Sequence, residues 1–171
     1  MNDCKLYSQS ETVEKLKVAL GKPRRAPVVL CIGSDRVTGD CIGPLVGHLL
    51  ESRGVDCTVL GSLRAPVTAV NLEETVSLLR KKFAGRKIIA VDSCVGDKCD
   101  VGKIRVSRGS LRPGLACGKV LPRVGDVSVT ATVAGGNSEN LYSVRLSLVF
   151  TLAECIAGAI DSALSSIKTA K

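Results

Sequence analysis

Aromatic residues are scarce in this chain of 171 residues, which has two tyrosines, two phenylalanines and no tryptophan. Proteins that bind single-stranded nucleic acid stack the bases on aromatic side chains, so the composition argues against this class of partner. A core with so few aromatics has to be built from Val, Ile, Leu and Ala, which suits a β-sheet covered by helices. With 45% hydrophobic residues, the chain is long enough for one domain with a single core.

Histidine occurs once, at position 48, and the eight cysteines form no Cys-x-x-Cys pair. Cys94 and Cys99 do not have the spacing of a zinc ribbon, and adding Cys41 and Cys117 from neighbouring loops produces no established metal motif. His48 falls inside a predicted helix, where a packed side chain is the commoner role. We therefore expect no metal ion and no other cofactor.

Long apolar segments are also missing from the sequence. No continuous apolar run reaches the roughly 18 residues that a membrane span requires, and no signal peptide is evident. Several cysteines lie within shorter apolar segments, where thiols behave as small hydrophobic groups. We therefore expect a cytoplasmic protein with reduced cysteines and no membrane contact.

Positive charge exceeds negative charge, with 24 Lys and Arg against 16 Asp and Glu and a net charge of +8. The basic residues are scattered along the chain. Short basic clusters at 22–25 and 80–82 fit a linker before a strand and the C-terminal end of a helix. A solvated basic surface explains the excess better than specific nucleic-acid binding.

Hydrophobic periodicity divides the chain into alternating strands and helices. Residues 1–26 are predicted to be a polar lead-in with an amphipathic helix, and residues 27–171 a single α/β domain. Strands are predicted at 28–33, 56–60, 87–92, 103–107 and 127–133, and helices at 41–53, 71–83 and 143–167. This order predicts a three-layer α/β/α sandwich around a mainly parallel sheet. Residues 93–126, rich in glycine and charge, are typical of an elaborated active-site loop.

Two aspartates stand at the ends of buried strands. Asp40 lies in a glycine-rich loop after the first strand, and Asp92 ends the third predicted strand. With a strand order of 2-1-3, the first and third strands are neighbours about 4.8 Å apart, and both carboxylates face one crevice. Two carboxylates in a partly dry crevice share a proton, because each charge disfavours the other. Such a pair can activate water and protonate the leaving nitrogen of an amide.

The same residues also have simpler structural interpretations. Asp40 stands where a helix N-cap is expected, and Asp92 is suited to fixing a turn after a strand. Gly39 and Gly43 suit a tight turn and close packing of a helix on a sheet. The spacing alone does not decide between these roles and catalysis.

Four short motifs follow one another along the chain: Gly33-x6-Asp40-x2-Gly43-Pro44, Leu63-x2-Pro66-x4-Asn71-Leu72, Ile89-x-Val91-Asp92-Ser93 and Arg112-Pro113-Gly114. In this order they resemble the sporulation protein YyaC family, and the similarity runs from about residue 26 to the C-terminus. That family is related to the germination protease, which degrades small acid-soluble spore proteins. In the germination protease two aspartates are held to be catalytic, one in the loop after the first strand just before a Gly-Pro pair and one at the end of a later strand. The resemblance assigns these two roles to Asp40 and Asp92.

Hydrogenase maturation endopeptidases resemble the segment up to Pro44. They have an acidic residue at the place of Asp40, another acid at a later strand end, and a histidine that completes a nickel-binding set. The later loops of this sequence contain no histidine. The resemblance therefore implies a fold of the germination protease and hydrogenase maturation endopeptidase type, with a weaker indication of nickel.

Together, the residues and the resemblance predict a cytoplasmic endopeptidase of sporulation or germination, with Asp40 and Asp92 as its catalytic dyad. The expected partner is a protein or peptide, with small acid-soluble spore proteins as candidate substrates, and the oligomeric state is left open. The residues expected to line the crevice and contact the substrate are Asn71, Ser34, Ser93 and Gly39. The serines lack a histidine base for a nucleophilic role. Two alternatives remain, a non-catalytic sporulation-associated binding protein and a nickel-dependent endopeptidase of the hydrogenase maturation type.

Overall fold

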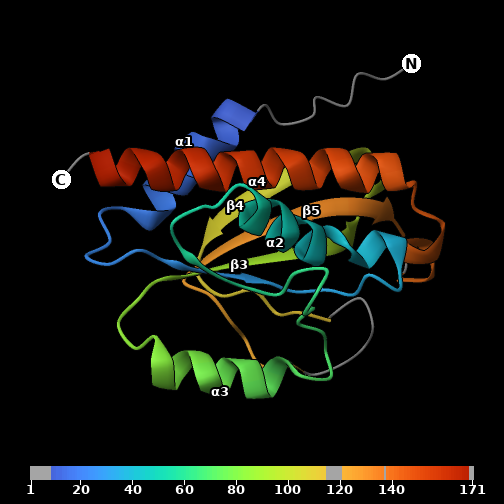
Figure 1. Ribbon diagram of the computed structural model, residues 1–171. Helices are drawn as coiled ribbons and strands as arrows, with labels where there is room; N and C mark the ends of the chain where they lie inside the picture. Colours follow the sequence, from blue (N-terminus) through green and yellow to red (C-terminus); the bar gives the residue numbers. More distant parts are fainter. Residues whose placement is uncertain (1–8, 115–120, 137, 170–171) are drawn as a thin grey trace.

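The computed structural model describes residues 9–114, 121–136 and 138–169, and in it helices cover both faces of a five-stranded sheet (Figure 1). The strands are β1 (Val28–Cys31), β2 (Thr58–Leu60), β3 (Ile88–Gly96), β4 (Ile104–Arg108) and β5 (Val127–Gly135). The helices are α1 (Gln9–Leu20), α2 (Ile42–Ser52), α3 (Leu72–Lys82) and α4 (Leu146–Thr169), with short 3-10 helices η1 (Thr38–Asp40), η2 (Lys98–Asp100) and η4 (Ser138–Ser143). The predicted three-layer α/β arrangement is confirmed, and the helix expected in the lead-in is α1.

The sheet has the strand order β2-β1-β3-β5-β4. Parallel pairs join β1 to β2, β1 to β3, and β3 to β5, whereas β4 runs antiparallel to β5. An antiparallel edge strand on a parallel sheet is common in α/β proteins. The predicted order 2-1-3 is therefore correct, and β1 and β3 lie side by side.

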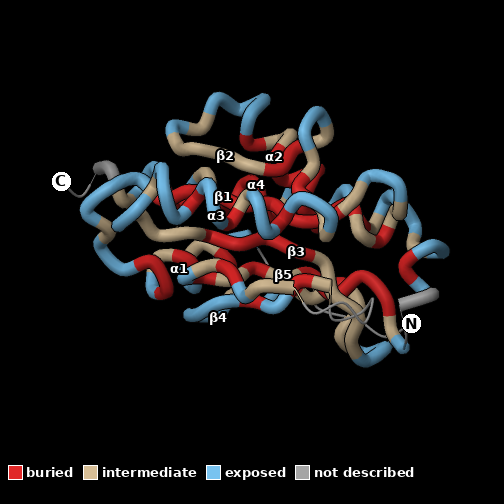
Figure 2. The backbone as a smooth tube through the Cα atoms, turned by 90° about the horizontal axis from the view of Figure 1, so that it is seen from below, coloured by how far each residue is buried: buried red, intermediate tan, exposed pale blue. Residues whose placement is uncertain are grey.

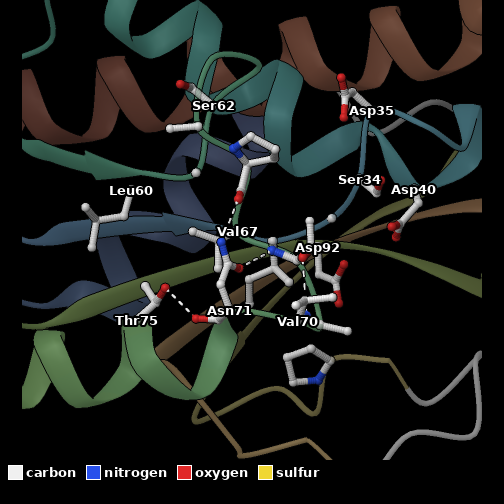
Figure 3. Close-up of a pocket in the computed structure, with 18 of the residues that line it drawn as sticks. Ser34, Asp35, Asp40, Leu60, Ser62, Val67, Val70, Asn71, Thr75 and Asp92 are labelled. Atoms are coloured by element: carbon white, nitrogen blue, oxygen red, sulfur yellow. Dashed lines mark hydrogen bonds between the residues drawn. The ribbon is translucent and has the colours of Figure 1, made fainter.

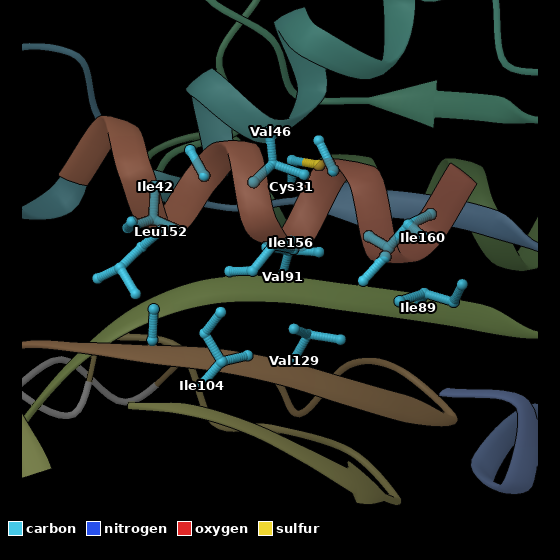
Figure 4. Packing of buried hydrophobic residues seen from close by; sticks show 14 of the residues in the cluster. Cys31, Ile42, Val46, Ile89, Val91, Ile104, Val129, Leu152, Ile156 and Ile160 are labelled. Atoms are coloured by element: carbon cyan, nitrogen blue, oxygen red, sulfur yellow. The ribbon is translucent and has the colours of Figure 1, made fainter. Parts of the chain in front are cut away.

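Alternating side chains of the strands fill a separate hydrophobic core on each face of the sheet. Val29 and Cys31 of β1 join the core under α1, α2 and α4, whereas Val28 and Leu30 join the smaller core under α3. This division follows from the two-residue period of a strand. Figure 4 shows the larger core, with residues of α4 packed over β3, and Figure 2 shows that the buried segments are concentrated along the sheet.

The C-terminal helix α4 is the longest helix in the described structure, and it is rich in apolar residues. By length and composition its residues 146–167 could cross a membrane, with a mean hydropathy of 1.5 in an 18-residue window. The sequence contains no continuous apolar run here, because Ser, Thr and acidic residues interrupt it. Half of that window is buried inside the protein, since Leu152, Ile156 and Ile160 belong to the larger core. Packing on the sheet therefore accounts for the composition of α4.

The prediction that β3 ends at Asp92 is wrong. The strand continues to Gly96, and β5 likewise continues to Gly135. The two strands pair with one another as far as Gly96 and Gly135, with a register shift after Cys94. The sequence pattern ends earlier because the residues after Asp92 are only half-buried. Asn137, part of the predicted break after β5, lies outside the described residues.

Candidate active site

A cavity of about 1010 Å³ opens beyond the carboxyl end of β1. Its walls come from the loop after β1, from the loop between β2 and α3, and from residues 113, 114 and 121 on the connection to β5 (Figure 3). A cavity of this size is at the upper end of the range for ligand pockets. It can hold several residues of an extended peptide.

The loop after β1 folds back on itself and returns Asp40 to the end of the strand. The Ser34 backbone N–H donates to the Asp40 carbonyl over 3.0 Å, and the Asp40 N–H donates to the Val37 carbonyl over 2.9 Å. Gly33 permits this closure, because its φ of +142° is rare for residues with a side chain and a Cβ atom there would collide with the Asp40 carbonyl oxygen. The glycine therefore sets the position of the aspartate.

Asp92 lies on β3 just beyond the point where β1 ends. The last paired residues of these two strands are Cys31 and Val91, so Asp92 is the first β3 residue that is no longer covered by β1. Its side chain lines the same cavity as Asp40 and has an exposed fraction of 8%. The structure thus brings the two aspartates to one cavity, although Asp92 is in the middle of its strand.

Ser93 contacts both aspartates. Its backbone N–H donates to Oδ1 of Asp92 over 2.8 Å, and its hydroxyl donates to Oδ1 of Asp40 over 3.5 Å. Ser93 is not among the residues that line the cavity. Ser93 therefore bridges the two carboxylates without lining the cavity, and these hydrogen bonds keep the relative orientation of the carboxylates.

Burial raises the pKa of both carboxyl groups. The pKa of Asp40 rises to about 6, mainly through loss of solvent, with hydrogen bonds from the Ser34 backbone and the Ser93 hydroxyl acting in the opposite direction. The pKa of Asp92 rises well above its ordinary value, first through burial and second through the negative charge of Asp40, while the Ser93 N–H opposes the shift. Because the Asp92 carboxyl is the more deeply buried of the two and also faces the charge of Asp40, the pair favours the state in which Asp92 holds the proton and Asp40 is ionised.

The two structural interpretations of these aspartates do not agree with their positions. Asp40 belongs to η1, and the N-cap residue of α2 is Cys41, which makes no side-chain capping hydrogen bond. The intervening 3-10 turn moves the start of the helix from the predicted residue 41 to Ile42. Asp92 does not end a strand. The Asp40 carboxylate is therefore not used as the cap of α2.

Asn71 supports the cavity wall between β2 and α3. Its Oδ1 accepts the Thr68 N–H over 2.8 Å, and its Nδ2 donates to the Pro66 carbonyl over 3.1 Å. The exposed side chain lines the cavity. In the described structure this amide holds the loop together, and contact with a substrate backbone stays a prediction.

The two remaining predicted site residues, Ser34 and Gly39, differ in whether they line the cavity. Ser34 lines the cavity, and its hydroxyl accepts the Arg36 N–H over 3.3 Å. Gly39 is buried and faces away, because a Cβ atom there would lie 2.7 Å from the Leu141 carbonyl oxygen of η4. The absence of a side chain at Gly39 therefore lets η4 pack closely against the loop that carries Asp40. Sequence reasoning did not identify Val70 or Pro113 as lining residues, although the second and fourth motifs enclose or contain them.

The described part of the chain contains no group of three or more His, Cys, Asp or Glu side chains arranged to hold a metal ion. His48 is half-buried on α2 and does not line the cavity. Cys117 of the cysteine set considered above lies outside the described residues. No observation in the described structure favours the nickel-dependent alternative.

Comparison with known proteins identifies relatives that cover almost all of the chain. The sequence model of a family described as protein of unknown function (DUF1256) matches residues 2–159. The uncharacterized protein YyaC of Bacillus subtilis (strain 168) is 38% identical over 161 residues, which are 91% of this chain and 77% of that protein. These matches confirm the resemblance to the YyaC family. They include all five strands and both cavity aspartates, and the chain therefore belongs to the DUF1256 family.

Proposed function

We propose that this protein is an endopeptidase that hydrolyses peptide bonds with Asp40 and Asp92, acting in the cytoplasm during sporulation or germination. The observation that carries the proposal is the pair of carboxyl groups on one large cavity, whose surroundings give them different affinities for a proton. Membership of the YyaC family supports the sporulation context. The expected substrates are proteins or peptides, with small acid-soluble spore proteins as the first candidates.

The two aspartates have complementary tasks in this reaction. Ionised Asp40 takes a proton from a water molecule, whose oxygen bonds to the carbon of the scissile carbonyl. Protonated Asp92 donates a hydrogen bond to the carbonyl oxygen and stabilises the negative charge that develops there. As the C–N bond breaks, Asp92 transfers its proton to the leaving nitrogen. The products are a carboxylic acid and an amine, and the pair still holds one proton, now on Asp40.

A direct test is incubation of the purified full-length protein with small acid-soluble spore proteins and with a mixture of unrelated peptides. Mass spectrometry of the products is expected to show internal cleavage that requires no added metal or nucleotide. If neither the spore proteins nor the peptides are cleaved, the endopeptidase proposal is contradicted and the non-catalytic binding protein becomes the better interpretation.

The activity is expected to have a bell-shaped dependence on pH. It rises as Asp40, with a pKa of about 6, loses its proton, and it falls at higher pH as Asp92 loses the proton whose pKa is raised by burial. Because the two groups interact, the two limbs report apparent pKa values of the pair. The measurement is kcat/KM between about pH 4 and pH 9. An activity that is unchanged while Asp40 titrates would contradict its role as the base.

Cleavage is expected to survive metal chelators. The reaction described above needs only the two carboxyl groups and water, and a protonated carboxyl group is neutral and therefore a poor ligand for a metal ion. The measurement is the cleavage rate after extended dialysis against EDTA, with and without added nickel or zinc. Loss of activity in EDTA that either metal restores would instead support a metal-dependent endopeptidase.

A further inference from the structure

The loop of residues 66–71 is held by its own hydrogen bonds and displays one apolar side chain. The Val70 N–H donates to the Thr68 hydroxyl over 3.2 Å, and the Asn71 N–H donates to the Thr68 carbonyl over 3.2 Å. Together with the amide contacts of Asn71 these bonds fix the backbone on both sides of Val70. None of them involves the Val70 side chain.

Val70 is the most exposed large hydrophobic residue in the described structure, with an exposed fraction of 90%. It lines the cavity that contains Asp40 and Asp92, and Figure 3 shows Val70 on the wall near Asp92. An apolar side chain fixed in water beside a pair of acids contributes nothing to the core. Covering the Val70 side chain with another apolar group would remove its apolar surface from water and lower the free energy of the system.

The walls of the cavity carry both polar and apolar side chains. Ser34, Asp35 and Asp40 lie on the loop after β1, and Val70 is an apolar lining residue that lies near Asp92 (Figure 3). Leu78 is also exposed, with 39% of its surface open to solvent. A peptide whose scissile bond lies at the aspartates therefore has apolar surface available for one of its side chains.

We propose that Val70 forms a specificity subsite for an aliphatic or aromatic side chain next to the scissile bond. This inference rests on the proposed endopeptidase function and adds its substrate preference. The contact between the substrate side chain and Val70 removes apolar surface of both from water, whereas a polar side chain placed on Val70 loses hydration without receiving a hydrogen bond from it.

The test uses full-length wild type, Val70→Ser, Val70→Asp and the control Val18→Ser, which changes another exposed valine, 64% exposed on α1 and outside the cavity. Peptides of one sequence are varied at a single position to Leu, Phe, Ser, Lys or Glu. For the wild type and the control, Leu and Phe peptides are expected to be cleaved preferentially. Val70→Ser is expected to lower kcat/KM for these two peptides about tenfold, mainly through KM, and leave the Ser peptide unaffected. Val70→Asp is expected to favour the Lys peptide.

Binding of the same peptides is measured in parallel by NMR shift changes on full-length Asp92→Asn protein, with and without Val70→Ser. Cleavage by the wild type with preferences that neither Val70 variant changes would overturn the subsite and leave the endopeptidase intact. Absence of all cleavage would overturn the endopeptidase. In that case preferential binding of Leu and Phe peptides that Val70→Ser abolishes would still support the subsite, and equal binding of all five peptides would overturn it.

Discussion

Asp40→Asn and Asp92→Asn are each expected to slow peptide cleavage by about 10²- to 10⁴-fold while the protein stays folded. Asparagine keeps the size of aspartate and much of its hydrogen bonding. It cannot accept a proton from water at position 40, and it cannot donate one to a leaving nitrogen at position 92. Because each step needs its own group, either substitution alone is sufficient for the loss.

The stability of these variants distinguishes a catalytic pair from a structural one. In the unfolded chain an aspartate has a pKa of about 3.9, whereas folded Asp92 keeps its proton to much higher pH. The folded state therefore binds more protons than the unfolded state above about pH 4, and the free energy of unfolding decreases as pH rises towards the folded pKa of Asp92. Asp92→Asn removes this loss. The variant is expected to be at least as stable as the wild type at pH 7 and to depend less on pH.

The measurement is the cleavage rate beside thermal melting, with Asp97→Asn as the matched control, since Asp97 is exposed and does not line the cavity. The control is expected to cleave and melt like the wild type. If both cavity variants melt normally and cleave at the wild-type rate, the dyad is wrong. A large loss of stability in Asp40→Asn would instead show that its carboxylate has a structural role.

Gly43→Ala is expected to reduce the free energy of unfolding by about 3 kcal/mol. Gly43 lies in the first turn of α2, directly over Ile32 at the end of β1. A Cβ atom at this position would collide with the Ile32 carbonyl oxygen and lie 2.6 Å from the Ile32 carbonyl carbon and nitrogen. These are backbone atoms and cannot turn aside as a side chain can. The helix has to move away from the strand whose end carries Gly33 and the Asp40 loop, so cleavage is expected to fall as well.

Gly158→Ala in α4 is the matched control for this substitution. The three atoms nearest to a Cβ atom there would all belong to the side-chain amide of Gln9, which can rotate away. Alanine is the better helix former, so the control is expected to keep or raise stability, by up to about 1 kcal/mol. The measurement is denaturant unfolding of both variants. Equal stability of Gly43→Ala and wild type would show that α2 does not approach β1 this closely.

The sequence was sufficient for the class of fold and for the expectation that Asp40 and Asp92 face one cavity. Uninterrupted apolar runs at β1 and β3 indicated parallel strands buried on both faces, and the glycine-punctuated loop between β1 and α2 identified one sheet edge as the place for chemistry. The sheet order 2-1-3 was a hypothesis that the structure confirms, and with it the neighbouring positions of β1 and β3. Such patterns depend on residues close together in the chain, which is why they could be recognised.

The tertiary structure decided where each carboxylate stands and what surrounds it. Asp92 lies within β3 because the strand finds a partner in β5, which is distant in the sequence, and the half-buried residues after Asp92 have no alternation that could reveal this pairing. The start of α2 moved to Ile42 because η1 closes the preceding loop.

The sequence did not reveal how deeply the two carboxyl groups are buried or that Val70 is exposed in the cavity. The raised pKa values of Asp40 and Asp92 come mainly from loss of solvent, which no spacing of residues reports. Val70 looks like any apolar residue in the sequence, and only the bonded loop around it shows that it faces the cavity. The sequence alone therefore determined the architecture and the placement of the two aspartates at one cavity, because periodicity and turn residues are local. Proton affinity and the shape of the cavity were decided by packing between segments that are far apart in the chain.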